Sequence, residues 1–475
     1  MTRPLPQRDN RTRRASYGKL FPDLPPLEAG PGQLSRLGRL GGPCDLGIAS
    51  GASNDARGDA VWPIFGQFIA HDITADRSPI DRPRHSNEIT NFRAPRANLE
   101  SVFGPGPVDA PYLYERADPA KLLLAASGLD VPRNHEGIAL IGDARNDSHI
   151  LISQMHVAFA KLHNRVVDHL RHAGVDESDV FEQARRSTIW HYQHIILREF
   201  LPRVIGSSLA SELREDGPRF FDVSADEPGL PSEFAAAAYR YGHAQIRQHY
   251  RVNTHFGPVP LFPDLVGFGP VDPEHAVDWS LHIGASAQRA KRIDMRLPRT
   301  LIELPAEVSG ASPESEYSSL AARDLARGPI AGLASGEAIA RAMGITPLDA
   351  EAIGLAQLGW RYETPLWLYV LKEAEALCDG ERLGPVAGRI VGEVLVGIID
   401  NDRESFRALE RDWQPWLGAD GSFSLADVLL AEQRIPPAVP RPAHDRQASR
   451  CAATSELRWR PGGSEHEPRR VILNQ

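Results

Sequence analysis

The stretch Phe65-Gly-Gln-Phe-Ile-Ala-His-Asp-Ile-Thr74 places three polar side chains inside an otherwise apolar segment. On a helix, Gln67 and His71 are four residues apart and project from one face, while Asp72 is turned by about 100° and points elsewhere. A buried polar group costs free energy unless it has a partner. The segment therefore predicts a hydrogen-bonded network or a ligand site, with one face suited to a reaction and the other to a hard cation. Taken alone, it also fits a structural core histidine beside a helix carboxylate.

The composition excludes several functional classes. A chain of 475 residues with 42% hydrophobic content can bury a large core. The net charge of −9 gives no electrostatic reason to expect nucleic acid as a partner. Cys44, Cys378 and Cys451 lack CxxC spacing, so neither a zinc site nor a disulfide framework is indicated.

The sequence also leads to an expectation about location. It contains no run of eighteen apolar residues, and residues 1–8 lack the apolar core of a secretory signal. We therefore expect no transmembrane segment and a cytoplasmic location, with unconventional export left open.

The pattern along the chain predicts one large, mainly α-helical domain with little β-structure. Residues 1–55 are rich in Pro and Gly and predict an extended arm, 56–435 form the helical domain, and 436–475 form a Pro- and Arg-rich tail. Gly174 and Pro202 are expected to end the first two long helices. Helices are expected over residues 151–173, 180–200, 233–247, 335–344, 347–357, 365–378 and 385–400.

Three further polar segments follow the first. They are Gly142-Asp-Ala-Arg-Asn-Asp-Ser-His149, Tyr239-Arg-Tyr-Gly-His243 and Leu320-Ala-Ala-Arg-Asp-Leu-Ala-Arg-Gly328. In this order, the four segments resemble the animal-type haem peroxidase superfamily, which includes myeloperoxidase, lactoperoxidase and cyclooxygenase, and most closely its bacterial branch. The resemblance covers roughly residues 55–432.

The resemblance implies roles on the distal side of a haem. His71 would be the acid–base residue that moves a proton between the two oxygens of hydrogen peroxide. Gln67 would line the small-molecule pocket, and Arg145 would stabilise negative charge that develops as the O–O bond breaks. His156 and His163 would be structural.

It also implies a proximal side. His243 would bind the haem iron, and Gly242 would leave room for the porphyrin. Arg240 is placed to pair with a haem propionate. Asp324 stands where the family has an asparagine that accepts the second imidazole N–H, and Arg327 would meet the haem edge or the same network.

Several positions depart from the family. The two carboxylates that form ester bonds to haem in the mammalian enzymes are Ala70 and Ser148 here, and the methionine that adds a third link in one member is His149. The resemblance therefore implies haem b held without covalent bonds, and iodide, bromide or aromatic donors rather than chloride. The oxygenase branch has a tyrosine three residues before the proximal histidine, whereas this chain has Arg240, which favours a peroxidase.

The family's calcium site is also changed. Asp72 remains, but the usual Thr and Asp of the later loop are Ala94 and Asn98. Calcium takes six to eight oxygen ligands, and backbone carbonyls can contribute, so the sequence leaves calcium open. The candidate ligands are Asp72, Ala94, Arg96, Asn98 and Glu100.

The expected function is a haem-dependent peroxidase that reduces hydrogen peroxide and oxidises a small donor. Two alternatives are a fatty-acid dioxygenase of the same superfamily and a haem-binding protein without turnover.

Overall fold

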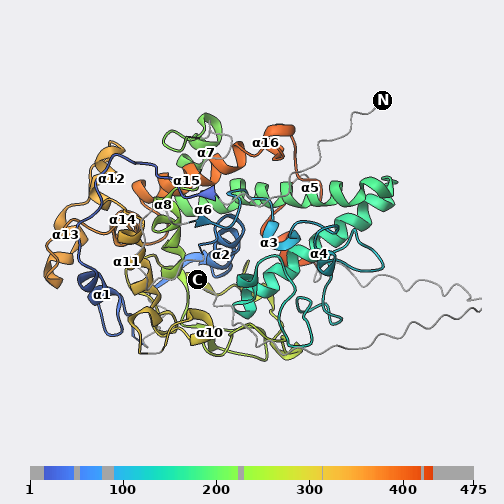
Figure 1. The fold of residues 1–475 in the computed structure, drawn as a ribbon, viewed down its shortest axis with the longest axis horizontal. Helices are drawn as coiled ribbons and strands as arrows, with labels where there is room; N and C mark the ends of the chain where they lie inside the picture. The colour runs from blue at the N-terminus through green and yellow to red at the C-terminus, as the bar shows by residue number, and fades with distance from the viewer. Residues whose placement is uncertain are drawn as a thin grey trace, which may run out of the picture.

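The computed structural model describes residues 15–47, 54–76, 90–222, 229–312, 314–418 and 422–431. Among these residues helices predominate, which confirms the mainly α fold class (Figure 1). The predicted tail at 436–475 lies outside the described residues. The strands in the described ranges form three two-stranded antiparallel sheets, which pair β1 (Ala15–Ser16) with β3 (Thr90–Asn91), β2 (Asp55–Asp59) with β6 (Arg289–Lys291), and β4 (His249–Tyr250) with β5 (Val259–Pro260).

Helices α4 (Ile150–His172) and α5 (Glu177–Ile195) form a long hairpin (Figure 1). The extent of α4 confirms the apolar spacing predicted over 151–173. Gly174 ends it with a left-handed φ of +80°, and its N–H donates to the Arg171 carbonyl at 3.0 Å. A residue with a Cβ would be strained at this φ, so the C-cap prediction for Gly174 is confirmed.

The prediction that Pro202 ends the second helix is wrong. After α5, a π-helical turn, η5 (Ile196–Phe200), leads into α6 (Leu201–Ile205), which has Pro202 in its first turn. The Leu201 N–H donates to the Ile196 carbonyl in the π-helical turn, and Pro202 follows at the first turn of α6, a position that proline tolerates. The helical path therefore continues until Gly206, whose φ is +87°.

The predicted helix over 233–247 is instead two short segments. Helix α8 (Ser232–Ala235) is followed by a break and then by the 3₁₀ segment η6 (Ala238–Gln245). Arg240 Nε donates to the Ala235 carbonyl at 2.9 Å, which takes an acceptor that a continuous helix would use. A local side-chain-to-backbone bond thus competes with the strong helix propensity of the alanines here.

The C-terminal half follows the predicted pattern with one interruption. Helices α12 (Gly336–Ala342), α14 (Leu366–Cys378) and α15 (Pro385–Asp400) lie where they were expected. The segment predicted at 347–357 is divided by Gly354 into α13 (Ala350–Ile353) and the 3₁₀ turn η10 (Leu355–Leu358). The remaining elements are α1 (Pro31–Gly38), α2 (Val61–Ile73), α3 (Glu100–Phe103), η3 (Pro111–Leu113), η4 (Ala144–Asp147), α7 (Ser207–Asp216), η7 (Pro273–His275), η8 (Trp279–Leu281), α9 (Arg299–Ile302), α10 (Ala306–Ser309), η9 (Glu316–Ser318), α11 (Leu320–Ile330), α16 (Phe406–Leu409) and α17 (Leu425–Leu429).

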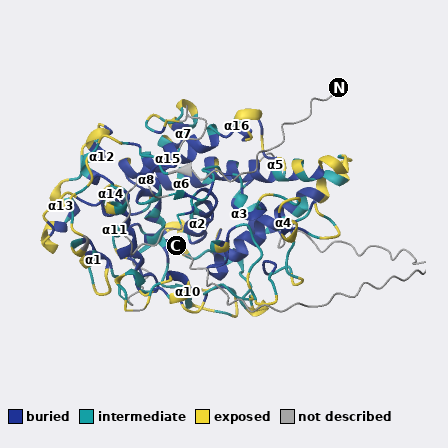
Figure 2. Ribbon diagram, in the orientation of Figure 1, coloured by how far each residue is buried: buried dark blue, intermediate teal, exposed yellow. Residues whose placement is uncertain are grey.

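Helix α2 lies in the middle of the core, between α4 and the segment that contains α8 and η6 (Figures 1 and 2). Phe65 and Phe68 of α2 are fully buried, and the ring of Phe68 stacks on Phe159 of α4 at 4.9 Å. Such aromatic packing holds α2 firmly, because these rings bury large apolar areas. The polar residues of α2 are therefore carried on a rigid element. No helix among the described residues is long and apolar enough to cross a bilayer.

The described part of the N-terminal arm packs closely on the domain. Helix α1 contributes Leu34 and Leu37 to the core. Upstream, the backbone of Gly18 pairs with the chain that enters α8, and the N–H groups of Leu20 and Phe21 donate to the buried carboxylate of Glu233 at 3.0 and 3.1 Å. Because β1 pairs with β3, the arm links the chain that follows α2 to the start of α8.

Candidate active site

His71 is buried on α2, and one of its ring nitrogens is engaged. Its Nδ1 lies 2.8 Å from Oδ1 of Asn146, and Asn146 Nδ2 lies 3.2 Å from Nδ1 of His156. Because the Asn146 amide donates to His156 through its nitrogen, its oxygen accepts a proton from His71 Nδ1. This leaves His71 Nε2 as an unprotonated nitrogen that can act as a base.

His71 stays neutral over the physiological pH range. Burial lowers its pKa from 6.5 to about 3, and the positive charge of Arg145 acts in the same direction. Burial likewise lowers the pKa of His156 to about 4. The two imidazoles and the amide between them therefore form a neutral network.

Gln67 is held by His149, which is the N-cap residue of α4. His149 Nδ1 accepts the backbone N–H of Ile152 at 3.3 Å, so its Nε2 carries the proton and donates to Gln67 Oε1 at 2.9 Å. The Gln67 NH₂ group, one turn before His71, remains available as a donor. Sequence reasoning assigned no contact to His149 or Asn146, although both lie in the loop that carries Arg145.

Arg145 anchors the end of α2. Its Nη2 donates to the carbonyls of His71 at 3.0 Å and Thr74 at 2.6 Å, and to Asp143 at 2.9 Å. Asp143 also receives Arg93 Nη2 at 2.7 Å. Burial alone would raise the pKa of Asp143, but the two guanidinium groups hold it well below its usual range. The single negative charge of Asp143 is shared by the two positive charges of Arg145 and Arg93, so a net positive charge remains near His71.

The proximal candidates meet between η6 and α11. His243 Nδ1 lies 2.6 Å from Oδ2 of Asp324, and Arg240 Nη1 lies 3.2 Å from Oδ1. Burial opposes ionisation, but His243 and Arg240 lower the pKa of Asp324, so it is a carboxylate. The carboxylate accepts the Nδ1–H of His243, so in the neutral imidazole Nε2 is the nitrogen without a proton. The His243 side chain is 29% exposed, while that of Asp324 is 0% exposed.

There is open space beside His243. A Cβ atom added to Gly242 would meet nothing within 4 Å. This agrees with the room that a porphyrin would need at this point.

Two sets of interactions connect the segments that carry the distal and proximal candidates. Arg327 Nη1, on the helix that carries Asp324, lies 3.2 Å from Oδ2 of Asp76, shortly after α2. The phenol of Tyr17 interacts electrostatically with Asp76, Arg145, Arg240 and Arg327, and burial and Asp76 raise its pKa. Tyr17 of the N-terminal arm therefore lies near charged side chains of both groups, since Arg145 is a distal candidate and Arg240 and Arg327 are proximal candidates.

The candidate calcium ligands are used differently. Asp72 Oδ2 accepts the backbone N–H groups of Asn98 at 3.0 Å and Leu99 at 2.9 Å, and Oδ1 accepts that of Ser101 at 3.1 Å. The Asn98 side-chain oxygen accepts the N–H of Glu100 at 3.1 Å.

The other members of this set do not supply the missing ligands. Glu100 pairs with Arg93 at 3.5 Å, Arg96 carries a cationic side chain, and the backbone carbonyl of Ala94 accepts the Arg96 N–H at 2.8 Å. Within the described ranges, no group of three or more His, Cys, Asp or Glu side chains could hold a metal ion. The predicted set Asp72, Ala94, Arg96, Asn98 and Glu100 therefore does not fit a calcium site, because backbone N–H donors already bond to both oxygens of the Asp72 carboxylate.

Comparisons with known proteins agree on the family. The animal haem peroxidase family matches residues 113–350, which include Arg145, His243, Asp324 and Arg327. Peroxidase skpo-1 of Caenorhabditis elegans is 25% identical over 397 residues, covering 73% of this chain and 58% of its own length. Chorion peroxidase of Drosophila melanogaster is 31% identical over 139 residues, 27% of this chain. This chain spans only 58% and 17% of those relatives.

Solved structures show the same fold. Peroxidase A from Dictyostelium discoideum has a TM-score of 0.60 at 15% identity and covers 88% of this chain and 91% of its own. The fatty acid α-dioxygenase of Arabidopsis thaliana has a TM-score of 0.57 at 15% identity and covers 80% of this chain and 72% of its own. From the family match over half of its length and from this shared fold, the chain belongs to the animal haem peroxidase family.

Proposed function

We propose that the chain binds haem b without covalent bonds between α2 and η6, reduces hydrogen peroxide and oxidises a small donor. The observation that carries this proposal is a shared arrangement of two imidazoles. His71 and His243 each have Nδ1 bonded to a buried acceptor, which leaves Nε2 as the nitrogen free of the proton in the neutral ring. Nitrogen atoms in this state suit a general base and an axial iron ligand, respectively.

The side chains of the site fit a haem group. His243 would hold the iron, with Asp324 keeping the ring in the required tautomer. Arg240 and Arg327 would supply positive charge for the haem carboxylates, although Arg240 also bonds to Asp324 and Arg327 to Asp76. When bound, haem supplies the redox chemistry that cleaves the O–O bond of hydrogen peroxide.

The distal residues would move one proton. His71 Nε2 takes it from one peroxide oxygen and returns it to the other, which leaves as water. Asn146 keeps the second ring nitrogen protonated during this exchange. The Gln67 NH₂ group and the charge of Arg145 favour an oxygen on which negative charge develops.

The mode of attachment favours donors that are easily oxidised. Ala70 and Ser148 stand where the mammalian enzymes carry ester-forming carboxylates, and neither side chain can form the bond. Iodide, bromide and aromatic compounds are therefore the proposed donors. Acidified organic solvent should extract all of the haem, and haem retained on the protein would contradict non-covalent binding.

The central test is stopped-flow mixing of haem-reconstituted protein with hydrogen peroxide. His71→Ala should slow the first absorbance change by about 10²- to 10⁴-fold while haem stays bound. His163→Gln is the matched control, since His163 is also a buried histidine, and its Nε2 bonds to the Ala120 carbonyl at 2.8 Å. An unchanged rate in His71→Ala would contradict the role of His71.

A dioxygenase is the second candidate, because the fold is shared with fatty acid α-dioxygenases. Oxygen uptake with linoleate or palmitate in an oxygen electrode would support it. Arg240 bonds to Asp324 at the position where the oxygenase branch has its tyrosine, which supports the peroxidase. A protein that binds haem without any fast reaction with peroxide would instead be a carrier or sensor.

A further inference from the structure

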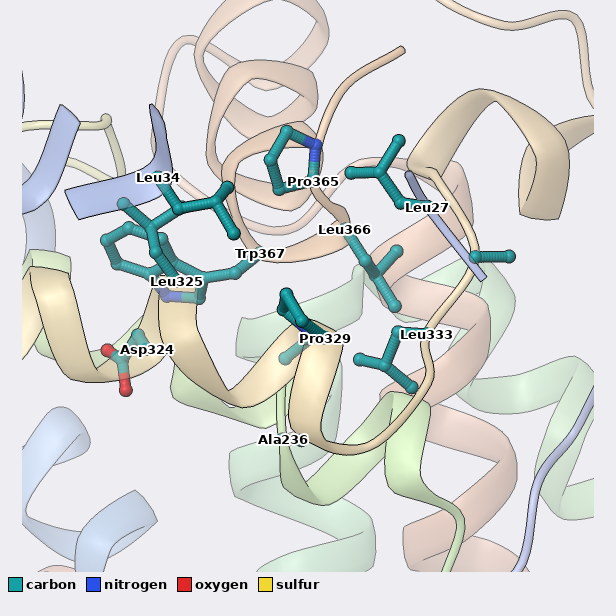
Figure 3. A pocket seen from close by; sticks show the side chains of 13 residues that line it. Leu27, Leu34, Ala236, Asp324, Leu325, Pro329, Leu333, Pro365, Leu366 and Trp367 are labelled. Carbon is teal, nitrogen blue, oxygen red and sulfur yellow. The ribbon is translucent and has the colours of Figure 1, made fainter. Parts of the chain in front are cut away.

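A small cavity lies beside helix α11, and Asp324 is one of the residues that line it. It has a volume of about 20 Å³, and most of its wall is apolar, with Leu34, Leu333 and Leu366 among the lining residues (Figure 3). A cavity with at least about 10 to 15 Å³ of such volume can hold one water molecule if polar partners are present. The question is therefore which polar groups reach it.

Trp367 supplies a donor. The side chain lines the cavity and is 2% exposed, and its Nε1 has no hydrogen-bond partner among the described residues. Figure 3 shows the indole nitrogen on the edge of the ring that faces helix α11, which carries Asp324. Buried N–H groups almost always have an acceptor, so an orphan at a cavity wall indicates a missing molecule.

Pro329 frees a backbone acceptor in the helix that forms part of the wall. It lies inside α11 and has no N–H, so the carbonyl of Leu325, four residues earlier, lacks its usual helical donor. Both residues line the cavity.

Asp324 supplies the third group. Its two oxygens accept one contact each, from Arg240 and His243, and a carboxylate has about four acceptor positions. Capacity remains for one more donor.

We propose that one ordered water occupies this cavity, accepts the Trp367 Nε1–H and donates to the Asp324 carboxylate and the Leu325 carbonyl. Three hydrogen bonds are the usual number for a buried water. Trp367 is then a positioning residue, which acts through the water and Asp324 on His243. The proposal of a water site does not depend on the proposed function. Only the spectroscopic test with haem rests on the proposed function.

Loss of the water should strengthen the hydrogen bond between His243 and Asp324. A water that donates to Asp324 shares the carboxylate's negative charge and weakens it as the acceptor of the His243 Nδ1 proton. Trp367→Phe keeps an aromatic ring but removes the donor, and a water with two partners is held less well. Asp324 then becomes the stronger acceptor, and His243 gains imidazolate character.

Resonance Raman spectroscopy of the ferrous, haem-reconstituted protein tests this. We expect the iron–histidine stretching band to move to higher frequency in Trp367→Phe and to lower frequency in Asp324→Asn. Trp360→Phe is the matched control, because the Trp360 N–H already donates to the Glu363 carbonyl at 3.1 Å. A packing role for Trp367 would lower the melting temperature without moving the band, and that result would overturn the proposal.

A second variant guards against misfolding of Trp367→Phe. Pro329→Ala restores a helical N–H for the Leu325 carbonyl and removes that acceptor from the water, so the band should again move to higher frequency.

A crystal structure of the protein without haem gives a readout that needs no cofactor. We expect one density peak within hydrogen-bonding distance of Trp367 Nε1 and Asp324. An empty cavity would overturn the water site even if haem binds normally. Failure to bind haem with the water present would instead contradict only the proposed function.

Discussion

Nδ1 of His71 lies 2.8 Å from Oδ1 of Asn146, although the two residues are 75 positions apart in the chain. Asn146 itself is fully buried, and its amide nitrogen is engaged with His156. The orientation of the amide therefore determines which nitrogen of His71 carries a proton. If His71 acts as a base through Nε2, its rate of proton transfer should depend on the Asn146 side chain, which keeps the proton on Nδ1.

Replacing Asn146 with Ala should slow the reaction with hydrogen peroxide by about 10- to 100-fold, as loss of an orienting partner typically does. The reason is that His71 can then protonate Nε2 instead of Nδ1. Stopped-flow absorbance measures the rate. Asn146→Asp should recover part of it, because a carboxylate still accepts from Nδ1. Asn164→Ala, which removes an amide that bonds only to the backbone of Leu122, is the control. A normal rate in Asn146→Ala would contradict the tautomer argument.

The same reaction should show little dependence on pH above 5. Burial holds the pKa of His71 at about 3, below the ordinary 6.5, so the ring stays unprotonated until the pH approaches 3. A histidine with an ordinary pKa would lose half of its activity near pH 6.5. We expect the second-order rate constant with peroxide to remain within about twofold between pH 8 and pH 5. A steep fall centred near pH 6.5 would mean that His71 is less buried than the structure indicates.

Asp324→Asn should raise the ferric/ferrous reduction potential. The carboxylate is a stronger acceptor than an amide and stabilises the oxidised iron through His243, which it contacts at 2.6 Å. If the Asp324 carboxylate changes the ferric/ferrous equilibrium constant by about 10- to 100-fold, the reduction potential changes by roughly 60 to 120 mV, because each tenfold change corresponds to 59 mV. Spectroelectrochemical titration measures it, and Asp324→Glu should stay closer to the parent. Equal potentials in the parent and Asp324→Asn would remove the argument.

Calcium should not affect the stability of the chain. Three backbone N–H groups neutralise Asp72, and burial raises its pKa to about 6. We expect EGTA to leave the melting temperature unchanged. Asp72→Ala should lose on the order of 3 kcal/mol, because charged hydrogen bonds are lost and buried donors are left unsatisfied. Glu100→Gln, which removes only a partly exposed ion pair with Arg93, should cost less than about 1 kcal/mol.

A melting temperature that falls with EGTA and recovers with added calcium would show that the loop binds the ion after all. Urea unfolding of Asp72→Ala with and without calcium completes this test, and calcium should not restore its stability.

Local sequence patterns were sufficient for the elements whose information is local. The apolar spacing of α4 and the glycine at its end predicted its extent, because one helix face must be buried and a left-handed residue stops the helix. The four-residue spacing placed Gln67 and His71 on one face of α2. The order of four polar segments was sufficient for the family.

Contacts between distant residues required the folded chain. The alanines that precede η6 favour a continuous helix, yet the chain breaks there, and Arg240 and His243 both bond to Asp324, more than 80 positions later. Asp76 pairs with Arg327, which is 251 positions later in the chain. Asp72 accepts backbone N–H groups from the loop that begins at Asn98, and the local sequence pattern did not predict these bonds. Helix propensity and periodicity depend on neighbours within a few residues, whereas hydrogen-bond partners are chosen by which buried groups the packed core brings together.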